Sequence, residues 1–500
     1  MESLANLFFG FGVALTPYNV VVAITGVFLG IIIGVLPGLG GTSGVAILLP
    51  LTIAMPPTSG IILLASIYWG ALFGGAITSI LFNIPGEPWS VATCFDGYPM
   101  AKQGRAGEAL ASAFIPGFFA SLTGILLFTF FAPPLAEIAL RFGPPENFSV
   151  LLLAFSTFTG LGGGSLPKTM ISIFIGFLLA SVGVDLVTGM PRLTFGSMVL
   201  LGGFSFITLS IGLFGIGEII LSAEESLQFR GVQAGVKPRD MWIVFKSIAQ
   251  NLKTFVTGTL LGFWIGVMPG TGATPASFLS YGLAKQYSKR PEKFGTGVPE
   301  GVMATECAAH AAGIGSLLPL VTLGIPGSPT AAVMLGGLYI WGLQPGPLLF
   351  TEKRDFVWGL ISSMYIGNVI ALIMCLLLVP LFAAILRIPY AILAPVIVLL
   401  SSLGAFAVKN AMVDLWLLLI FGLIGYVFKK LGYPLAPFVI ALVLGDMTEE
   451  ALRQSLIMSD ASFAIFFTRP IAAFFMSIAI FLFLLPVLRP LWRRIRMPKD

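Results

Sequence analysis

The sequence predicts an all-α polytopic membrane protein with about 10–14 membrane segments, arranged as two inverted-topology repeats with re-entrant or broken helical hairpins. Three observations support this fold class: an apolar composition, a Gly/Pro-rich motif that occurs twice, and basic residues that flank the two copies differently. Of 500 residues, 57% are hydrophobic and 10% are charged, and the mean hydropathy is +0.99. This composition excludes a series of soluble domains and indicates membrane segments of about 20 residues each.

The duplicated motif is the strongest of these observations. The stretch Gly26 to Gly44 reads GVFLGIIIGVLPGLGGTSG, and the stretch Gly258 to Ala276 matches it at ten of nineteen positions. A second pair of motifs follows, IPGEP from Ile84 and IPGSP from Ile325. Proline removes a backbone donor and glycine relaxes a helix, so each half carries two breaks within apolar sequence. Paired breaks of this kind are typical of the binding site of a secondary transporter.

The distribution of Lys and Arg predicts that the two halves are inverted. No basic residue flanks the first motif between Met1 and Ser59, whereas basic loops lie on both sides of the second motif. Because basic loops favour the cytoplasm, the first hairpin is expected to enter the membrane from outside and the second from the cytoplasm. The expected organisation is an N-terminal membrane repeat (1–222), a cytoplasmic connecting segment (223–253), a C-terminal membrane repeat (254–488) and a basic cytoplasmic tail (489–500).

The remaining apolar stretches are expected to be spans or half-spans. Gly60 to Ala101 is too long for one helix across about 30 Å of hydrocarbon, so it must be broken, and IPGEP is the natural place. The other expected segments are Ala109 to Phe131, Phe148 to Gly160, Thr169 to Asp185, Phe195 to Leu221, Val357 to Leu386, Ala391 to Phe406, Val413 to Phe428, Pro434 to Leu444 and Phe463 to Leu488.

The hairpin tips and the IPGxP breaks are the predicted binding site for substrate or ions. Glycine lets backbone amides and carbonyls face a cavity, and helix N-termini favour a carboxylate, so no arginine is needed there. The alternative is that the glycines only permit close helix packing. The predicted residues are Pro37, Gly38, Gly40, Thr42, Ser43, Asn83, Pro85, Gly86, Pro269, Gly270, Thr271, Gly272, Thr274, Pro326, Gly327 and Ser328.

Glu306 and His310 are a second candidate pair, because residues four apart share a helix face. Ionisable groups at membrane depth are costly and usually functional, so this pair could couple transport to an ion, or the two residues could simply pair with each other. No metal site is expected beyond a possible transported Na⁺, since a single histidine lacks partners. Three scattered cysteines are expected to be packing residues. GGGSLPKT near Lys168 lacks the glycine of a phosphate loop, so ATP is not expected to drive the protein.

The longest motifs carry a family resemblance. GVLPGLG, the run NIPGEPWSVATCFDGYPMAKQGRAGEAL from Asn83, GPPE at Gly143, GGGSLPK at Gly162 and LGIPGSPTAAVMLGGLYIWGLQPGP from Leu323 are similar to the large membrane subunit TctA of the tripartite tricarboxylate transporters. The resemblance implies a small TctB-like membrane subunit, a periplasmic TctC-like solute-binding protein and uptake driven by an ion gradient. The sequence departs from many relatives at Ala309-His310, where an Asn-Asn pair is expected; this leaves the substrate and the coupling ion open.

The expected function is therefore transport and not catalysis. The chain would be the permease subunit, in the bacterial inner membrane with a cytoplasmic C-terminus, for a tricarboxylate or other organic acid, with Na⁺ or H⁺ as coupling ion and no further cofactor. Its partners would be the two other subunits, the substrate and the bilayer, with no nucleic acid. The alternatives are a permease of the same fold for an aromatic or sugar acid and, less favoured, a membrane-embedded enzyme that uses Glu306 and His310.

Overall fold

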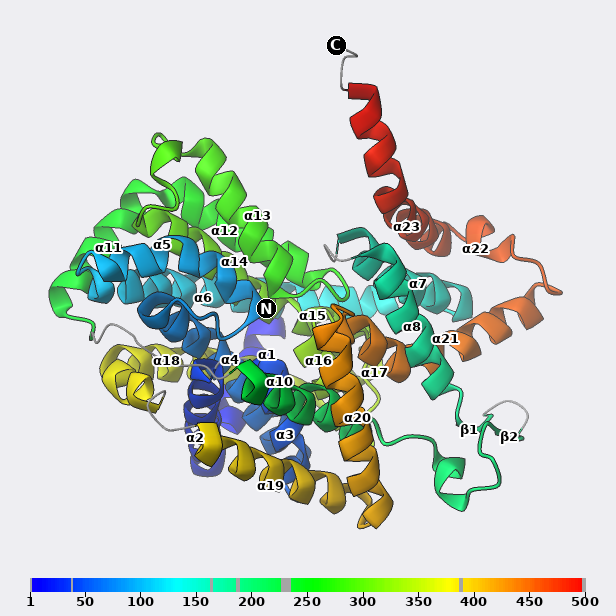
Figure 1. Ribbon diagram of the computed structural model, residues 1–500. Helices are drawn as coiled ribbons and strands as arrows, with labels where there is room; N and C mark the ends of the chain where they lie inside the picture. Colours follow the sequence, from blue (N-terminus) through cyan, green and yellow to red (C-terminus); the bar gives the residue numbers. More distant parts are fainter. Residues whose placement is uncertain are drawn as a thin grey trace.

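The computed structural model describes residues 2–36, 39–161, 165–185, 189–225, 235–385 and 390–496, and nearly all of them are helical (Figure 1). The protein is an all-α polytopic membrane protein, as predicted. Within the described residues, seven helices are long and apolar enough to cross a membrane, and seven further apolar helices are shorter, at 10–17 residues. The predicted 10–14 membrane segments are therefore a mixture of full-length and shorter helices.

The first half contains the first copy of each motif and then a group of shorter elements. Its first elements, up to residue 139, are α1 (Glu2–Ala14), α2 (Pro17–Val35), α3 (Gly40–Leu48), η1 (Leu49–Ala54), α4 (Pro57–Phe82), η2 (Pro88–Ser90), α5 (Val91–Lys102) and α6 (Ala106–Ala139). The elements that follow are α7 (Pro144–Leu161), α8 (Leu166–Ala180), β1 (Gly183–Val184), β2 (Pro191–Arg192), η3 (Met198–Gly202), α9 (Phe206–Ser210), the π-helical turn η4 (Ile211–Ile216) and α10 (Gly217–Glu225).

The second half contains the second copy of each motif, and here the helix before the IPG break is divided into α14 and α15. Its elements are α11 (Pro238–Gln250), α12 (Leu252–Val267), α13 (Ala273–Tyr287), η5 (Pro291–Lys293), α14 (Pro299–Gly315), α15 (Leu317–Leu323), α16 (Pro329–Ile340), α17 (Pro347–Glu352) and α18 (Arg354–Ile385). The C-terminal helices are α19 (Tyr390–Lys409), α20 (Met412–Lys430), α21 (Leu435–Met458), α22 (Ile465–Thr468) and α23 (Pro470–Arg496).

Glycines spaced four apart hold two helices of each copy in backbone contact. This glycine ladder consists of Gly26, Gly30 and Gly34 on α2, which faces α4, and of Gly258, Gly262 and Gly266 on α12, which faces α14. On α2, a Cβ added at Gly30 would overlap the carbonyl group of Ile67 on α4. On α12, a Cβ added at Gly262 would overlap the carbonyl group of Ala308 on α14 in the same way. Small residues spaced four apart let membrane helices approach this closely. The helical glycines of the duplicated motif therefore permit close packing of the two helices in each copy.

The IPG breaks also adopt the same geometry in both copies. Helix α4 ends at Asn83 with φ +59°, and α15 ends at the corresponding Gly324 with φ +73°. In each copy the next isoleucine N–H reaches back six residues, from Ile84 to the Thr78 carbonyl at 3.3 Å and from Ile325 to the Pro319 carbonyl at 3.2 Å. This bond closes a left-handed helix cap. The predicted break of the segment from Gly60 to Ala101 at IPGEP is confirmed.

Helices of the two halves interleave. In Figure 1, α5 and α6 of the first half lie beside α12–α14 of the second half, and α14 contacts both α5 and α6. On the opposite side of the molecule, α7 and α8 pack against α21, and α7 also packs against α23. The core is therefore shared between the halves, and residues from both copies meet near its centre.

Three expected segments have different bounds in the structure. The stretch expected from Phe195 to Leu221 becomes helical only at Phe206, because η3 and a two-residue antiparallel hairpin, β1–β2, precede it. The segment expected to end at Leu444 continues to Met458. The connection at 223–253 contains the 13-residue helix α11, on which Trp242 and Phe245 are exposed. Residues 226–234 of that connection lie outside the described residues.

Asp96 connects α5 by hydrogen bonds to the segment that precedes α14. Its buried carboxylate accepts three backbone N–H groups at 2.9 Å, from Gly295, Gly297 and Val298, and the Tyr281 hydroxyl at 2.8 Å. Hydrogen bonds to a buried charged group are worth more than those between neutral groups.

Asp96→Ala is therefore expected to lower the free energy of unfolding by about 4 kcal/mol, because it removes these bonds and leaves buried N–H groups without acceptors. Thermal unfolding in detergent measures the change. Glu292→Ala, at an exposed site, is the control and should shift stability by no more than about 0.5 kcal/mol. Equal effects of the two substitutions would contradict this role for Asp96.

Candidate functional site

A cavity of about 980 Å³ lies where the two hairpin tips and the two IPGxP breaks meet. Its volume is in the range of small-molecule sites. The first copy and the second copy both contribute polar groups to its wall, while aromatic and proline residues supply much of the rest. The lining residues are Thr42, Tyr68, Glu87, Pro88, Trp89, Phe158, Thr169, Ile265, Met268, Gly270, Thr271, Gly272, Ala273, Thr274, Pro275, Phe278, Leu279, Ser328, Pro329, Thr330, Pro434, Ala436, Pro437 and Leu482.

The tip of the second hairpin is bonded to the second break. The Gly270 N–H donates to the Pro326 carbonyl at 3.1 Å, and the Gly272 N–H donates to the Gly327 carbonyl at 3.0 Å. Both glycines have positive φ, +76° and +64°, a conformation that residues with a side chain rarely adopt. Helix α13 starts immediately afterwards, and its first residues line the cavity. The N-terminal end of a half-helix is therefore at the cavity wall.

The tip of the first hairpin meets the second copy directly. Gly40 has φ +56°, as Gly272 does at the equivalent position, and α3 starts there. The hydroxyl oxygens of Thr42, on α3, and Thr330, on α16, are 2.9 Å apart. This contact joins residues from the two repeats across the cavity, and it places the duplicated breaks side by side.

The two IPGxP breaks differ at the residue that follows IPG. The residue after IPG is Glu87 in the first copy and Ser328 in the second. The Glu87 carboxylate lies at the start of α3, where its Oε1 accepts a hydrogen bond from the Gly41 N–H. Ser328 instead caps α16, since its hydroxyl accepts the Ala331 N–H at 3.1 Å. The chain thus supplies a carboxylate to the N-terminus of α3 but none to that of α13.

Of the predicted site residues, six line this cavity: Thr42, Gly270, Thr271, Gly272, Thr274 and Ser328. Pro37 and Gly38 lie outside the described residues. The others lie around the cavity without lining it: Gly40, Ser43, Asn83, Pro85, Gly86, Pro269, Pro326 and Gly327.

Several of these neighbours have visible structural roles. The Ser43 hydroxyl donates to the Phe214 carbonyl at 2.9 Å, and Asn83 caps α4. Gly86 and Gly327 each sit where a Cβ would overlap the carbonyl oxygen of the last glycine in the ladder, Gly34 or Gly266. These residues hold the breaks against the helices, so they position the cavity wall.

Glu306 and His310 lie together on one face of α14, as their spacing predicts, but they do not line the cavity. Both side chains are 1% exposed. The Glu306 carboxylate accepts a 2.5 Å hydrogen bond from the Thr93 hydroxyl and lies 3.5 Å from His310 Nδ1. His310 Nδ1 donates to the Glu306 backbone carbonyl at 2.9 Å. The pair forms a buried contact between α14 and α5.

The prediction of site residues omitted five polar groups of the cavity wall: Tyr68, Glu87, Trp89, Thr169 and Thr330. Glu87 and Trp89 are within the first IPGEPW run, so their position next to the break was a usable signal. Tyr68 is inside a long apolar helix and Thr330 follows the second break, and only the folded chain brings them to the tips.

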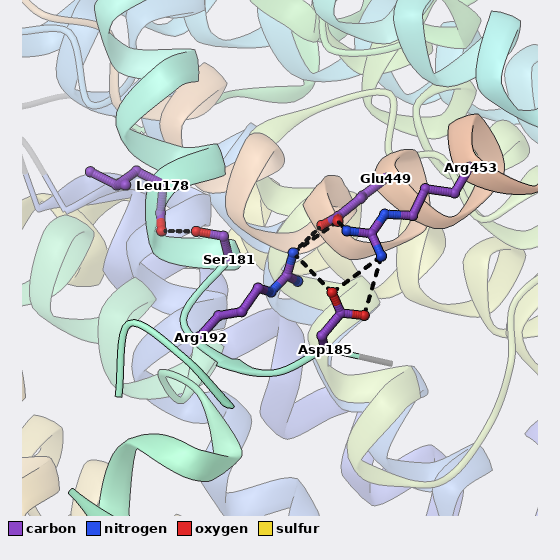
Figure 2. Close-up of polar contacts among 6 residues, drawn as sticks. All are labelled: Leu178, Ser181, Asp185, Arg192, Glu449 and Arg453. Carbon is purple, nitrogen blue, oxygen red and sulfur yellow. Dashed lines mark hydrogen bonds and ion pairs between the residues drawn. The ribbon is translucent and has the colours of Figure 1, made fainter. Parts of the chain in front are cut away.

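A second cavity, of about 750 Å³, lies beside the β1–β2 hairpin and α21. Figure 2 shows Arg192 and Arg453 alternating with Asp185 and Glu449 in a closed ring of ion pairs. The four nitrogen–oxygen distances range from 2.6 to 3.5 Å. Asp446 and Glu450 also line this cavity. Because its arginines are already paired and it has an excess of carboxylates, it suits an organic anion less well than the cavity between the tips.

Comparison with known proteins identifies relatives over most of the chain. Residues 20–440 match the model of the tripartite tricarboxylate transporter TctA family. A protein of Agrobacterium vitis, described as an uncharacterized 52.8 kDa protein in the TAR-I ttuC' 3' region, is 40% identical over 96% of this chain and 95% of its own length. A second, described as an uncharacterized protein in the TAR-II ttuC' 3' region of the same organism, is 40% identical over 46% of this chain and 96% of its own length. No solved structure matches.

Proposed function

Because this chain belongs to the tripartite tricarboxylate transporter TctA family, we propose that it is the large permease subunit of a secondary transporter that imports an organic acid with a cation gradient. The family is one of multi-pass membrane transporters, and the apolar helices of this chain agree with that. The observation that carries the more specific proposal is the cavity between the hairpin tips. In secondary transporters, substrate and ion sites lie at the interface between repeats and are built from broken helices.

The chemistry of the cavity supports a carboxylate as the substrate group. The N-terminus of α13 carries a partial positive charge and has free backbone N–H groups, and the Thr274 hydroxyl lines the cavity beside it. Such a helix end binds anions without a cationic side chain. Among the described residues, no lysine or arginine lines the cavity.

Alternating access follows from the inverted arrangement that the basic residues indicate. If the two hairpins enter from opposite sides, rocking of one repeat against the other opens the cavity to each side in turn. The same basic residues support placing the C-terminus in the cytoplasm of a bacterial inner membrane. Family membership supports a small TctB-like membrane subunit and a periplasmic TctC-like binding protein as partners.

One observation favours a variant of this function. Trp89, Phe158 and Phe278 line the cavity, and aromatic walls of this kind pack well against an aromatic ring. An aromatic acid such as terephthalate is therefore a second candidate substrate beside a tricarboxylate or a sugar acid.

Uptake of radiolabelled citrate, terephthalate and gluconate into proteoliposomes tests the proposal. The vesicles contain this chain with its small subunit, and the binding protein is added outside. We expect accumulation of at least one of these acids only when the binding protein and an inward Na⁺ or proton gradient are both present. Full uptake with ATP as the only energy source, or without any gradient, would refute the proposal.

A further inference from the structure

We propose that Glu87 holds the coupling cation, a proton or a sodium ion, at the cavity between the hairpin tips, so that an organic anion binds there only together with that cation. This inference rests on the proposed function and names the residue through which substrate and cation are coupled. It differs from the expectation that placed coupling at Glu306 and His310.

The cavity wall contains an acidic side chain. Glu87 is the one Asp, Glu, His, Lys or Arg side chain among the described residues that line the cavity, and it is only 7% exposed. A substrate carboxylate at the start of α13 would therefore enter a cavity that already contains a carboxylate. Like charges in a poorly solvated site repel strongly, and one of them must be neutralised or bridged by a cation.

The Glu87 carboxylate is held at the start of α3. Its Oε1 accepts a hydrogen bond from the Gly41 N–H, and Gly40 has no room for a side chain because the carboxyl group lies against it. The ring of Tyr68 closes the other side of Gly41. These contacts hold the Glu87 carboxyl group against the start of α3.

The titratable neighbours of Glu87 do not replace a cation that would neutralise or bridge the two carboxylates. Lys429 acts on Glu87 electrostatically, but its ammonium group forms an ion pair with Glu218. Tyr68, the other titratable neighbour, carries no positive charge in any state. A mobile cation would cancel the negative charge that the backbone N–H groups at the starts of α3 and α13 offset only in part.

Oxygen atoms suitable for a cation surround the same place. Glu87 directly follows the non-helical segment of the first break, and unwound backbone of this kind coordinates Na⁺ in other transporters. The hydroxyls of Thr42 and Thr330, 2.9 Å apart, line the same cavity. A proton would need only the carboxylate. Both cations make the same change, which is to cancel one negative charge at the tip of α3.

The Glu306–His310 pair is less well placed for coupling. Its carboxylate is bonded to Thr93 and adjacent to His310, and neither residue lines the cavity. A cation bound there would not face the substrate.

Glu87→Gln tests the proposal, because glutamine keeps the acceptor for the Gly41 N–H and removes the charge. In detergent, binding of radiolabelled citrate, or of whichever tested acid is taken up fastest, is measured over a range of Na⁺ concentrations and of pH. We expect affinity in the unaltered protein to rise about tenfold or more with one of the two cations, and less than about twofold in Glu87→Gln. In proteoliposomes the variant should still exchange substrate across the membrane but should not accumulate it.

The outcomes separate the two proposals. If the unaltered protein takes up none of the acids under any gradient, the proposed function fails. If it accumulates an acid, and Glu87→Gln keeps its cation dependence while Glu306→Gln loses it, only the assignment to Glu87 is overturned. Sodium dependence at fixed pH identifies Na⁺ as the cation, and pH dependence without Na⁺ identifies a proton. Glu352→Gln, at an exposed glutamate at the end of α17, is the control that should behave as the unaltered protein.

Glu87→Asp keeps the test decisive if the glutamine variant does not fold. Aspartate retains the charge but draws it back by one methylene group from the cavity. We expect cation-dependent binding with a half-saturating cation concentration raised about threefold or more. An unchanged half-saturating concentration in a folded aspartate variant would overturn the proposal.

Discussion

Alanine in place of Gly30 or Gly262 is expected to lower the free energy of unfolding by about 3 kcal/mol, because either methyl group would enter the backbone of the facing helix. A Cβ at Gly30 would overlap the carbonyl of Ile67, and a Cβ at Gly262 would lie 2.6 Å from the Cα of Ala308. Backbone atoms cannot rotate away as a flexible side chain would, so the helices must separate. Separation would also end the contacts of Gly86 with Gly34 and of Gly327 with Gly266. Because these contacts hold the breaks in position, the cavity wall would shift.

Thermal unfolding in detergent, followed by size-exclusion chromatography, measures this effect. Gly12→Ala on α1 and Gly282→Ala on α13 are matched controls, because a Cβ at either position meets no atom within 4 Å. A helical glycine replaced by alanine without a clash is expected to raise stability by about 0.5–1 kcal/mol. Equal behaviour of ladder and control variants would show that the two helix pairs are not in backbone contact.

The duplicated parts of the fold were predictable because glycine and proline have few structural roles in membrane helices. The IPG motifs predict breaks within apolar helices. The structure contains this break in both copies, with equivalent left-handed caps at Asn83 and Gly324. The close helix contacts at Gly30 and Gly262 were not predicted from the motif. The inverted orientation of the copies depends on the side of the membrane at which each loop lies, and it remains a prediction from the basic residues.

The site was predictable only in part, because the cavity depends on which side chains long-range packing brings to the tips. Thr42, Thr274 and Ser328 lie in the motifs themselves, and they line the cavity. Ser43 follows Thr42 in the same motif, but adjacent residues on a helix face different directions. The Ser43 hydroxyl therefore donates to the Phe214 carbonyl and does not reach the cavity. Tyr68 is on a helix that is buried all round, so no periodicity marks the one face that reaches the tips.

The ionisable residue next to a break, Glu87, lines the cavity, whereas the ionisable pair within a helix, Glu306 and His310, does not. Glu306 and His310 satisfied the rule that residues four apart share a face, and the structure confirms that geometry. That rule says nothing about what the face contacts, which here is α5 and not the cavity. Glu87 is placed by the backbone at the end of the break, where irregular structure must line a cavity or be buried in protein.

A disulfide between the two repeats is expected to abolish uptake reversibly. Thr42 and Thr330 belong to different copies, and their hydroxyl oxygens are 2.9 Å apart. Sulfur atoms in a disulfide are about 2.0 Å apart, so cysteines at these positions need only a small adjustment to bond. Because the bond would join the first hairpin tip to the residue after the second IPGxP break, at the cavity wall, it would prevent one repeat from moving against the other and would obstruct the substrate.

The experiment uses Thr42→Cys/Thr330→Cys in a chain whose native Cys94, Cys307 and Cys375 are replaced by alanine. The two single variants are controls for the loss of each hydroxyl, and oxidation should leave their uptake unchanged. Uptake is assayed in proteoliposomes before oxidation, after oxidation and after reduction with dithiothreitol. Peptide mass spectrometry on the same samples identifies the crosslink.

This crosslink is the most direct test that the two duplicated breaks meet to form one transport cavity. The account predicts that oxidation joins position 42 to position 330 within a single chain, that uptake stops in proportion to the crosslinked fraction, and that reduction restores it. A folded double variant that forms no such bond, or a fully crosslinked protein that transports at the rate of its reduced form, would contradict the account.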